Sequence, residues 1–216
     1  MYKLVIFDLD GTLLNTLTDL ANACNAALRA CALEEHPTDA YKTYVGDGVY
    51  KLIERMVPKE YRNDNMIQHV KEIFDAHYAE HSLDHTKPYE GILELIISLR
   101  NQGIHCAVAS NKPHEYTKEL VKKMFGERIE LAFGKRIDVP AKPNPAIVLE
   151  IIKHFNMQLE ECLYVGDSDV DIYTAKNAGL TSVGVLWGYR TENELASAGA
   201  KYMVKNPKDL QQLILG

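Results

Sequence analysis

The sequence predicts an α/β fold in which a parallel-sheet core carries an inserted, all-helical domain, and three observations support this. The apolar run Leu4–Phe7 is followed directly by acidic residues and a glycine, which is typical of a strand buried on both faces of a parallel sheet. From Thr16 to about Asp84 apolar residues recur at helical spacing, with few strand signals. From Pro88 onward strand and helix signals alternate, which indicates βαβ units.

The first predicted helix begins near Thr16. Thr16 and Asp19 resemble a capping box, in which the two side chains satisfy backbone N–H groups at the start of a helix. One apolar face of this helix is formed by Leu17, Leu20, Ala21, Cys24, Ala27, Leu28 and Cys31. Turn-forming residues 46–48 and Pro58 interrupt the helical stretch, so we expect several helices in this region.

The second half of the chain supplies most of the predicted sheet. A helix is expected near residues 90–101 and should end at Gly103. Short strands are predicted at residues 104–109, 129–133, 162–165, 181–185 and 202–204, with amphipathic helices between them. We therefore expect a core domain made of residues 1–14 and 86–216 and a helical insert made of residues 15–85.

Composition narrows the classes of partner. A chain of 216 residues suits one large domain or a core with a small insert, and a net charge of −6 with both signs mixed argues against a nucleic-acid surface. The four cysteines have no metal-ligand spacing, which favours reduced thiols: Cys24, Cys31, Cys106 and Cys162. The sequence shows no signal peptide and no apolar stretch of the roughly 20 residues that span a bilayer, so we expect a cytoplasmic protein with no membrane partner.

Polar side chains follow several of the predicted strands at the point where each strand ends. Asp8 and Asp10 come directly after the first strand and point the same way, because side chains alternate along a strand. Gly11 then allows a tight turn. The later segments of this kind contain Ser110, Asn111 and Lys112, then Lys142, then Asp167, Ser168, Asp169 and Asp171. Ligands of open α/β sheets bind at the carboxyl ends of the strands, so we expect one site here.

In order and spacing, these segments resemble the four motifs of the haloacid dehalogenase superfamily of phosphotransferases. The run from Asp8 to Thr12 is similar to motif one, Ser110 to motif two, Lys142 to motif three, and Gly166-Asp167 with Asp171 to motif four. The resemblance covers nearly the whole chain. It implies a Rossmann-like core with a helical cap inserted directly after motif one, the arrangement called C1-type.

Within the superfamily the chain most resembles the phosphoglycolate phosphatase subgroup. The segments that carry this resemblance are Ser110-Asn111-Lys112-Pro113, Lys142-Pro143-Asn144-Pro145 and the run from Gly166 through Gly188 and Tyr189. The resemblance implies a phosphatase of small phosphomonoesters, with 2-phosphoglycolate as the leading substrate. Whether the protein is a monomer or a homodimer is left open.

The resemblance also implies roles for individual residues. Asp8 would attack phosphorus and form an aspartyl-phosphate, which divides the hydrolysis of a very inert ester into two easier steps. Asp10 would protonate the leaving oxygen and later accept a proton from water. Lys142 would offset the charge of the phosphate. The groups implied to bind the phosphate are Ser110, Asn111, Lys142, Gly11 and Thr12.

The implied cofactor is Mg²⁺, which prefers oxygen ligands. Its ligands would be a carboxylate oxygen of Asp8, the backbone carbonyl of Asp10 and the carboxylate of Asp167, and Asp171 would hold metal-bound water. The role of Asp169 stays open. Asn15 and Thr16 replace the aspartate and serine that follow motif one in many relatives, which bears on the hinge into the cap and on substrate contacts but not on the chemistry.

Several alternatives keep the same chemistry or the same fold. A sugar-phosphate mutase similar to β-phosphoglucomutase would return the phosphoryl group to substrate, and a pyrophosphatase relative would hydrolyse a different bond. A phosphonatase would need a desolvated cap lysine, for which Lys51 is the candidate. A non-catalytic binding module would retain the fold without turnover, but all four motifs are intact.

Two features of the predicted cap are candidates for a functional site. Gly46, Asp47 and Gly48 are a candidate specificity loop that closes over the phosphate pocket, and a simple turn between helices is the alternative. His77, His81 and His85 recur every four residues, but three such positions spread over about 12 Å of helix axis. We therefore interpret the three histidines as cap surface and not as a zinc site.

Overall fold

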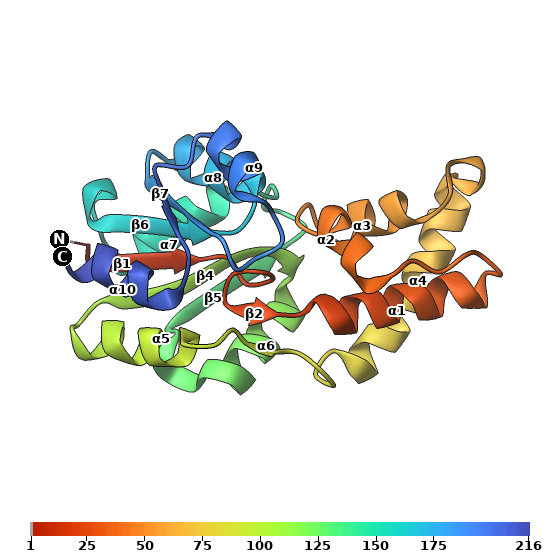
Figure 1. Ribbon diagram of the computed structural model, residues 1–216, viewed down its shortest axis with the longest axis horizontal. Coiled ribbons are helices and arrows are strands. Elements are labelled where there is room, and N and C mark those ends of the chain that lie inside the picture. The colour runs from red at the N-terminus through yellow and green to blue at the C-terminus, as the bar shows by residue number, and fades with distance from the viewer. Residues whose placement is uncertain (1) are drawn as a thin grey trace. The chain divides into compact units, whose positions relative to one another are not determined.

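The computed structural model describes residues 2–216, and the chain forms two compact units. The first, here called the core unit, comprises residues 2–14 and Pro88–Gly216, and the second, the helical unit, comprises Asn15–Lys87. Figure 1 shows the helices and strands of both units. Among residues 2–216, no helix combines the length and the apolar character that crossing a membrane requires.

The core unit is built on a six-stranded sheet in the order β5-β4-β1-β6-β7-β8, and every neighbouring pair is parallel. Its strands are β1 (Leu4–Phe7), β4 (His105–Pro113), β5 (Leu131–Lys135), β6 (Cys162–Gly166), β7 (Thr181–Val185) and β8 (Tyr202–Val204). Its helices are α5 (Ile92–Asn101), α6 (His114–Phe125), α7 (Ala146–Phe155), α8 (Asp169–Ala178), α9 (Glu192–Ala198) and α10 (Pro207–Leu215).

Strand β1 lies in the middle of the sheet, as its uninterrupted apolar sequence predicts. All four of its residues are fully buried, and it pairs with β4 on one side and β6 on the other. Its last residue, Phe7, is in register with Val108 and with Val165. The residues that follow these three positions therefore emerge together at the carboxyl edge of the sheet.

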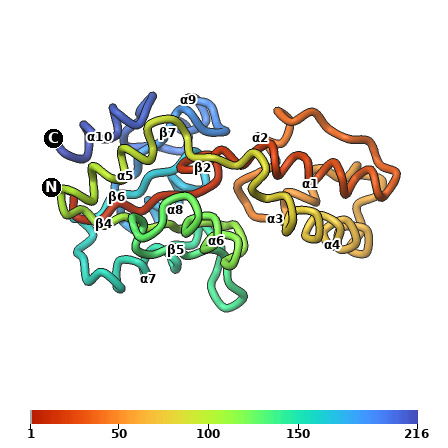
Figure 2. Tube along the Cα trace, turned by 90° about the horizontal axis from the view of Figure 1, so that it is seen from below, coloured from red at the N-terminus to blue at the C-terminus, as the bar shows by residue number. Residues whose placement is uncertain are grey.

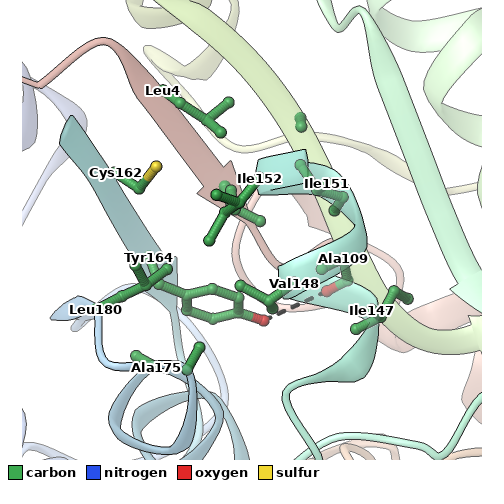
Figure 3. Packing of buried hydrophobic residues seen from close by; sticks show 13 residues of the cluster. Leu4, Ala109, Ile147, Val148, Ile151, Ile152, Cys162, Tyr164, Ala175 and Leu180 are labelled. Carbon is green, nitrogen blue, oxygen red and sulfur yellow. Dashed lines mark hydrogen bonds between the residues drawn. The ribbon is translucent and has the colours of Figure 1, made fainter. Parts of the chain in front are cut away.

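Helices cover both faces of the sheet. On one face α7 and α8 pack onto alternate residues of the central strands, and Figure 3 shows the ring of Tyr164 among Val148, Ala175 and Leu180. Helices α5 and α10 contact each other and lie on the opposite side of the strands from α7 (Figure 2). This confirms the predicted α/β class with a parallel sheet.

The strands lie close to their predicted positions. Residues 181–185 and 202–204 form strands with the predicted bounds, whereas β5 begins two residues later than expected. Strand β4 extends four residues beyond the expected end, to Pro113, with an irregular register against β5 between Ala109 and Pro113. The polar residues after Ala109 remain extended because they are still part of this strand.

The helical unit contains four α-helices, and the two longest pack against each other. Its helices are α1 (Leu17–Ala30), α2 (Tyr41–Tyr44), α3 (Val49–Met56) and α4 (Asp64–His81). Helix α4 begins after Asn63, whose side chain accepts a hydrogen bond from the Met66 N–H. The chain passes between the units through β2 (Leu14–Asn15) and β3 (Lys87–Pro88), and these two short strands pair with each other.

The predicted capping box at Thr16 and Asp19 is wrong. The backbone of Thr16 already has helical dihedral angles, and its side chain makes no cap hydrogen bond to the first turn of α1. Asp19 is fully buried and instead accepts hydrogen bonds of 2.8 to 3.0 Å from the backbone N–H groups of His85 and Thr86 and from the Thr86 hydroxyl. Asp19 thus joins the two ends of the helical unit.

We expect Asp19→Ala to lower the free energy of unfolding by about 2–4 kcal/mol, because three donors, two of them on the buried Thr86, lose their acceptor. Chemical denaturation followed by circular dichroism measures this change. Asp39→Ala is the matched control, since the Asp39 side chain is 84% exposed in its ion pair with Lys42 and should change stability by no more than about 0.5 kcal/mol. Equal effects of the two substitutions would contradict the assigned role of Asp19.

Candidate active site

The site begins at the carboxyl end of β1. Asp8 is buried, and its N–H donates to the Val165 carbonyl at 2.9 Å, which continues the pairing of β1 with β6. Gly11 then turns the chain with φ +86°, a conformation that side chains disfavour. A Cβ at Gly11 would also overlap the carboxylate of Asp167, so only glycine fits this approach.

The end of β6 contributes the next two carboxylates. Ser168 caps α8 through a capping box with Asp171: the Ser168 N–H and hydroxyl donate to Asp171 Oδ2 at 3.0 and 2.6 Å. The cap fixes the fully buried Asp171 at the third position of the helix. Asp169, whose role the sequence left open, occupies the first position of α8, is half-buried, and does not belong to the cluster of three aspartates described next.

Carboxylate oxygens of Asp8, Asp167 and Asp171 lie within 4.8 Å of one another. Because these groups are buried together, the charge of Asp171 disfavours ionisation of Asp8 and of Asp167. Burial, with the charge of Asp171 as the next cause, raises the pKa of Asp8 to about 7 and that of Asp167 to about 8. The cluster therefore needs positive charge if all three carboxylates are to be ionised near neutral pH.

Lys142 supplies one such charge. Its Nζ donates to Asp171 Oδ1 at 2.8 Å and lies 2.9 Å from Asp8 Oδ1, an ion pair without hydrogen-bond alignment. Although burial lowers the pKa of Lys142, the carboxylates of Asp171 and Asp8 raise it well above its ordinary value, so the ammonium stays charged. The Lys142 side chain is 1% exposed.

Two side chains hold this lysine in place. Asn111 binds its backbone on both sides: the Lys142 N–H donates to Asn111 Oδ1 at 2.9 Å, and Asn111 Nδ2 donates to the Lys142 carbonyl at 3.1 Å. Tyr164 accepts a hydrogen bond of 3.1 Å from Lys142 Nζ, and its hydroxyl lies 3.2 Å from Asp171 and 3.4 Å from the Ala109 carbonyl, a contact drawn in Figure 3. Asn111 was predicted to bind phosphate, and its side chain is engaged in positioning Lys142.

The extended end of β4 places two more polar residues at the site. The Ser110 hydroxyl is buried and accepts the Lys112 N–H at 3.2 Å. The ammonium of Lys112 lies 3.2 Å from both carboxylate oxygens of Asp10. No role of Lys112 is predicted from the sequence, although its position next to Ser110 and Asn111 at a strand end is a signal for one.

Asp167 is held by residues from both ends of the chain. The Thr12 hydroxyl donates to Asp167 Oδ1 at 3.0 Å and the Tyr189 N–H donates to Oδ2 at 2.8 Å. Trp187 Nε1 in turn donates to the Thr12 carbonyl at 2.9 Å, and a Cβ at Gly188 would overlap Asp167. Thr12 was predicted to bind phosphate, and its hydroxyl orients Asp167. Nothing in the sequence indicates that residues 187–189 hold Thr12 and Asp167 in place, because this segment contains no aspartate, glutamate, lysine, arginine or histidine.

The three aspartates are consistent with a divalent metal site. Asp8 Oδ1 is buried and has no hydrogen-bond partner among the described residues, and all the nearby acceptors are hard oxygen atoms. Asp171 is the least available of the three, because Lys142 and Tyr164 contact one of its oxygens and Ser168 binds the other. The donor set therefore fits a cation such as Mg²⁺ with Asp8 and Asp167 as its carboxylate ligands.

The remaining candidate residues belong to the helical unit. Gly46 and Gly48 have positive φ angles before α3, and Asp47 between them forms an ion pair with Arg55. Lys51 is exposed and forms an ion pair with Glu54 at 2.6 Å, unlike the desolvated lysine that Schiff-base chemistry requires.

The three histidines do not form one ligand set. Helix α4 ends at His81, so His85 lies beyond it, where its N–H donates to Asp19. His81 Nδ1 lies 2.8 Å from Asp84 Oδ2.

Comparison with known proteins identifies relatives over nearly the full length of the chain. The family model for haloacid dehalogenase-like hydrolases matches residues 5–185. A phosphoglycolate phosphatase of Aquifex aeolicus is 32% identical over 213 residues, which are 98% of this chain and 96% of that protein. A phosphoglycolate phosphatase of Mannheimia succiniciproducens is 32% identical, with 99% of this chain and 98% of the relative covered.

Solved structures share the same fold. A crystal structure from Lactobacillus delbrueckii subsp. bulgaricus, whose description as a phosphoglycolate phosphatase is itself a prediction, has a TM-score of 0.95 and 32% identity over 100% of this chain and 99% of the other. A predicted phosphoglycolate phosphatase from Haemophilus somnus has a TM-score of 0.91 and 27% identity, with 98% and 97% of the two chains covered.

The raised pKa values of Asp8 and Asp167 predict how stability depends on pH without metal. The folded protein retains these protons up to about 7 and about 8, whereas the unfolded chain loses them near 3.8. Unfolding therefore releases protons between these values, and this contribution to stability falls as pH rises from 3.8 to about 8.

We expect Mg²⁺ to raise the melting temperature more at pH 8 than at pH 5, because protons compete with the metal at the lower pH. Thermal unfolding in EDTA and in Mg²⁺ at both pH values measures this difference. In EDTA, Asp167→Asn should reduce the loss of stability with pH, since an amide has no proton to release. An equal Mg²⁺ shift at the two pH values would contradict the assignment.

Proposed function

Because the chain belongs to the haloacid dehalogenase-like hydrolase family, we propose that it is a Mg²⁺-dependent phosphatase of small phosphomonoesters that works through an aspartyl-phosphate on Asp8. The observation that carries the proposal is the convergence of a buried aspartate at the end of β1, Lys142 2.9 Å from it, and Asp167 from the end of β6. The relatives named phosphoglycolate phosphatases favour 2-phosphoglycolate as the substrate.

In the first step, a carboxylate oxygen of Asp8 attacks phosphorus and the bond from phosphorus to the leaving oxygen breaks. Asp10 donates a proton to that oxygen, so the alcohol leaves in its neutral form. The Lys142 ammonium lowers the repulsion between Asp8 and the negatively charged phosphoryl group. Ser110, buried at the end of β4, is placed to contact the oxygens of the transferred group.

In the second step, water attacks phosphorus and the bond between phosphorus and Asp8 breaks. Asp10, now a carboxylate, accepts the proton of the attacking water, which restores the starting state of both aspartates. The products are the free alcohol and inorganic phosphate. Asp171 positions Lys142 throughout, because its Oδ1 atom accepts a hydrogen bond from the ammonium at 2.8 Å.

Asp8, Asp167 and the backbone carbonyl of Asp10 would hold Mg²⁺. Both oxygens of Asp171 accept hydrogen bonds from Lys142, Tyr164 and Ser168, so Asp171 would act by positioning Lys142 and not by binding metal-bound water. The cation would supply positive charge that stabilises the phosphoryl oxygens in the transition state. Asp8 and Asp167, whose pKa values are raised by burial, would then be ionised at neutral pH.

Asp8→Asn should lower kcat by at least about 10³-fold, because an amide cannot form the phospho-intermediate. The measurement is the release of inorganic phosphate, together with the melting temperature to show that the variant is folded. Glu127→Gln is the matched control and should retain activity, because it also replaces a carboxylate by an amide in the core unit but at an exposed residue. Phosphatase activity close to wild type in a folded Asp8→Asn protein would reject the mechanism.

Among phosphomonoesters, we expect the highest kcat/KM for 2-phosphoglycolate and much lower values for nucleotides, hexose phosphates and pyrophosphate. Each compound is assayed with Mg²⁺ and with EDTA, and phosphate release should require the metal. Isomerisation of a sugar phosphate without phosphate release would indicate the mutase alternative. The exposed, paired Lys51 already argues against a phosphonatase.

A further inference from the structure

The site contains a second buried lysine that the mechanism above does not use. Lys112 lies at the end of β4, its side chain is 3% exposed, and its Nζ is 3.2 Å from each carboxylate oxygen of Asp10, whose side chain is 13% exposed. Burying an ion pair costs desolvation energy that the mutual attraction often fails to offset. Stability alone is therefore a weak reason for a lysine at this position.

Contacts of the Lys112 backbone with neighbouring residues fix the position from which its side chain extends. The Lys112 N–H donates to Ser110 Oγ at 3.2 Å, and its carbonyl accepts the Thr117 hydroxyl at 3.3 Å. Gly134 on β5 packs so closely against that carbonyl that a Cβ there would overlap it. Lys112 is thus anchored by the sheet, unlike the exposed Lys118 one helical turn into α6, whose side chain is 56% exposed.

Lys112 and Lys142 serve different ends of the substrate. Lys142 lies against Asp8, which bonds to phosphorus, whereas Lys112 lies against Asp10, which protonates the leaving oxygen. An acid that protonates this oxygen must come within about 2.6 to 3.2 Å of it. The Lys112 ammonium, 3.2 Å from that acid, therefore lies within about 6.5 Å of the leaving oxygen.

We propose that Lys112 is a specificity-determining residue that binds a carboxylate on the leaving group, so that the site favours phosphate esters with a carboxylate on the carbon next to the ester oxygen. The inference rests on the proposed function and names its substrate class. By ordinary bond lengths, such a carboxylate lies about 3 to 4 Å from the leaving oxygen, within reach of an ammonium beside Asp10. The symmetric contact of Lys112 with both oxygens of Asp10 is itself a carboxylate-binding geometry.

Charge supports the same assignment. A carboxylate on the leaving group is negatively charged, and the buried Lys112 ammonium attracts it at a place that is shielded from water. An ester with a neutral leaving group gains nothing comparable from that ammonium.

The test compares 2-phosphoglycolate with 2-hydroxyethyl phosphate, which has nearly the same size and a neutral leaving group. We expect wild-type kcat/KM to be at least about 10-fold higher for the acid, and Lys112→Met to reduce this ratio roughly 10- to 100-fold, the range of a charge-assisted hydrogen bond. Lys112→Arg keeps the charge and should retain part of the ratio. Lys118→Met is the matched control and should leave the ratio at its wild-type value.

The ratio separates specificity from a general effect on Asp10. If a folded Lys112→Met protein loses activity equally on both esters, Lys112 serves only Asp10 and the proposal is overturned. If wild-type enzyme hydrolyses the two esters equally well, the proposal fails without any variant. In both cases the proposed phosphatase function is unaffected, because Asp8-dependent release of phosphate is still observed. If no phosphomonoester is hydrolysed, the proposed function itself is rejected.

Discussion

The site depends on the crowding of three aspartates in one buried place. Carboxylate oxygens of Asp8, Asp167 and Asp171 lie within 4.8 Å of one another, an arrangement that is electrostatically unfavourable unless cations or protons compensate it. Lys142 compensates part of the charge by contacting two of the three carboxylates. The negative charge that Lys142 does not compensate makes the cluster consistent with a divalent metal site.

The surrounding structure holds the charges together by close backbone approach and neutral hydrogen bonds. Gly11 and Gly188 leave no room for a Cβ beside Asp167, and Gly166 leaves none beside Asp171. Asn111 holds the backbone of Lys142 through two hydrogen bonds. Such neutral contacts fix the geometry of the acidic cluster without adding to its charge, which accounts for the glycine, amide and hydroxyl groups around it.

Polar residues next to the motifs were the hardest to interpret from sequence. Thr12 and Asn111 were predicted to bind phosphate, which stays a prediction, and the structure adds contacts of their side chains with Asp167 and with the backbone of Lys142. Asp19 fits a local cap pattern but binds residues 66 and 67 positions later in the chain. A hydroxyl, amide or carboxylate can satisfy several partners, and local spacing does not distinguish a near partner from a distant one.

The sequence by itself determined the α/β class, the order of strands and helices, and the polar residues at the strand ends that lie together in the candidate site. It could do so because burial on both faces of a parallel strand imposes an unbroken apolar run, and the residues after such a run must emerge at one edge. Only the tertiary structure decided which polar group contacts which, including the pairing of Lys112 with Asp10. Those contacts join segments about a hundred residues apart, and their geometry follows from strand register and helix packing that no local pattern encodes.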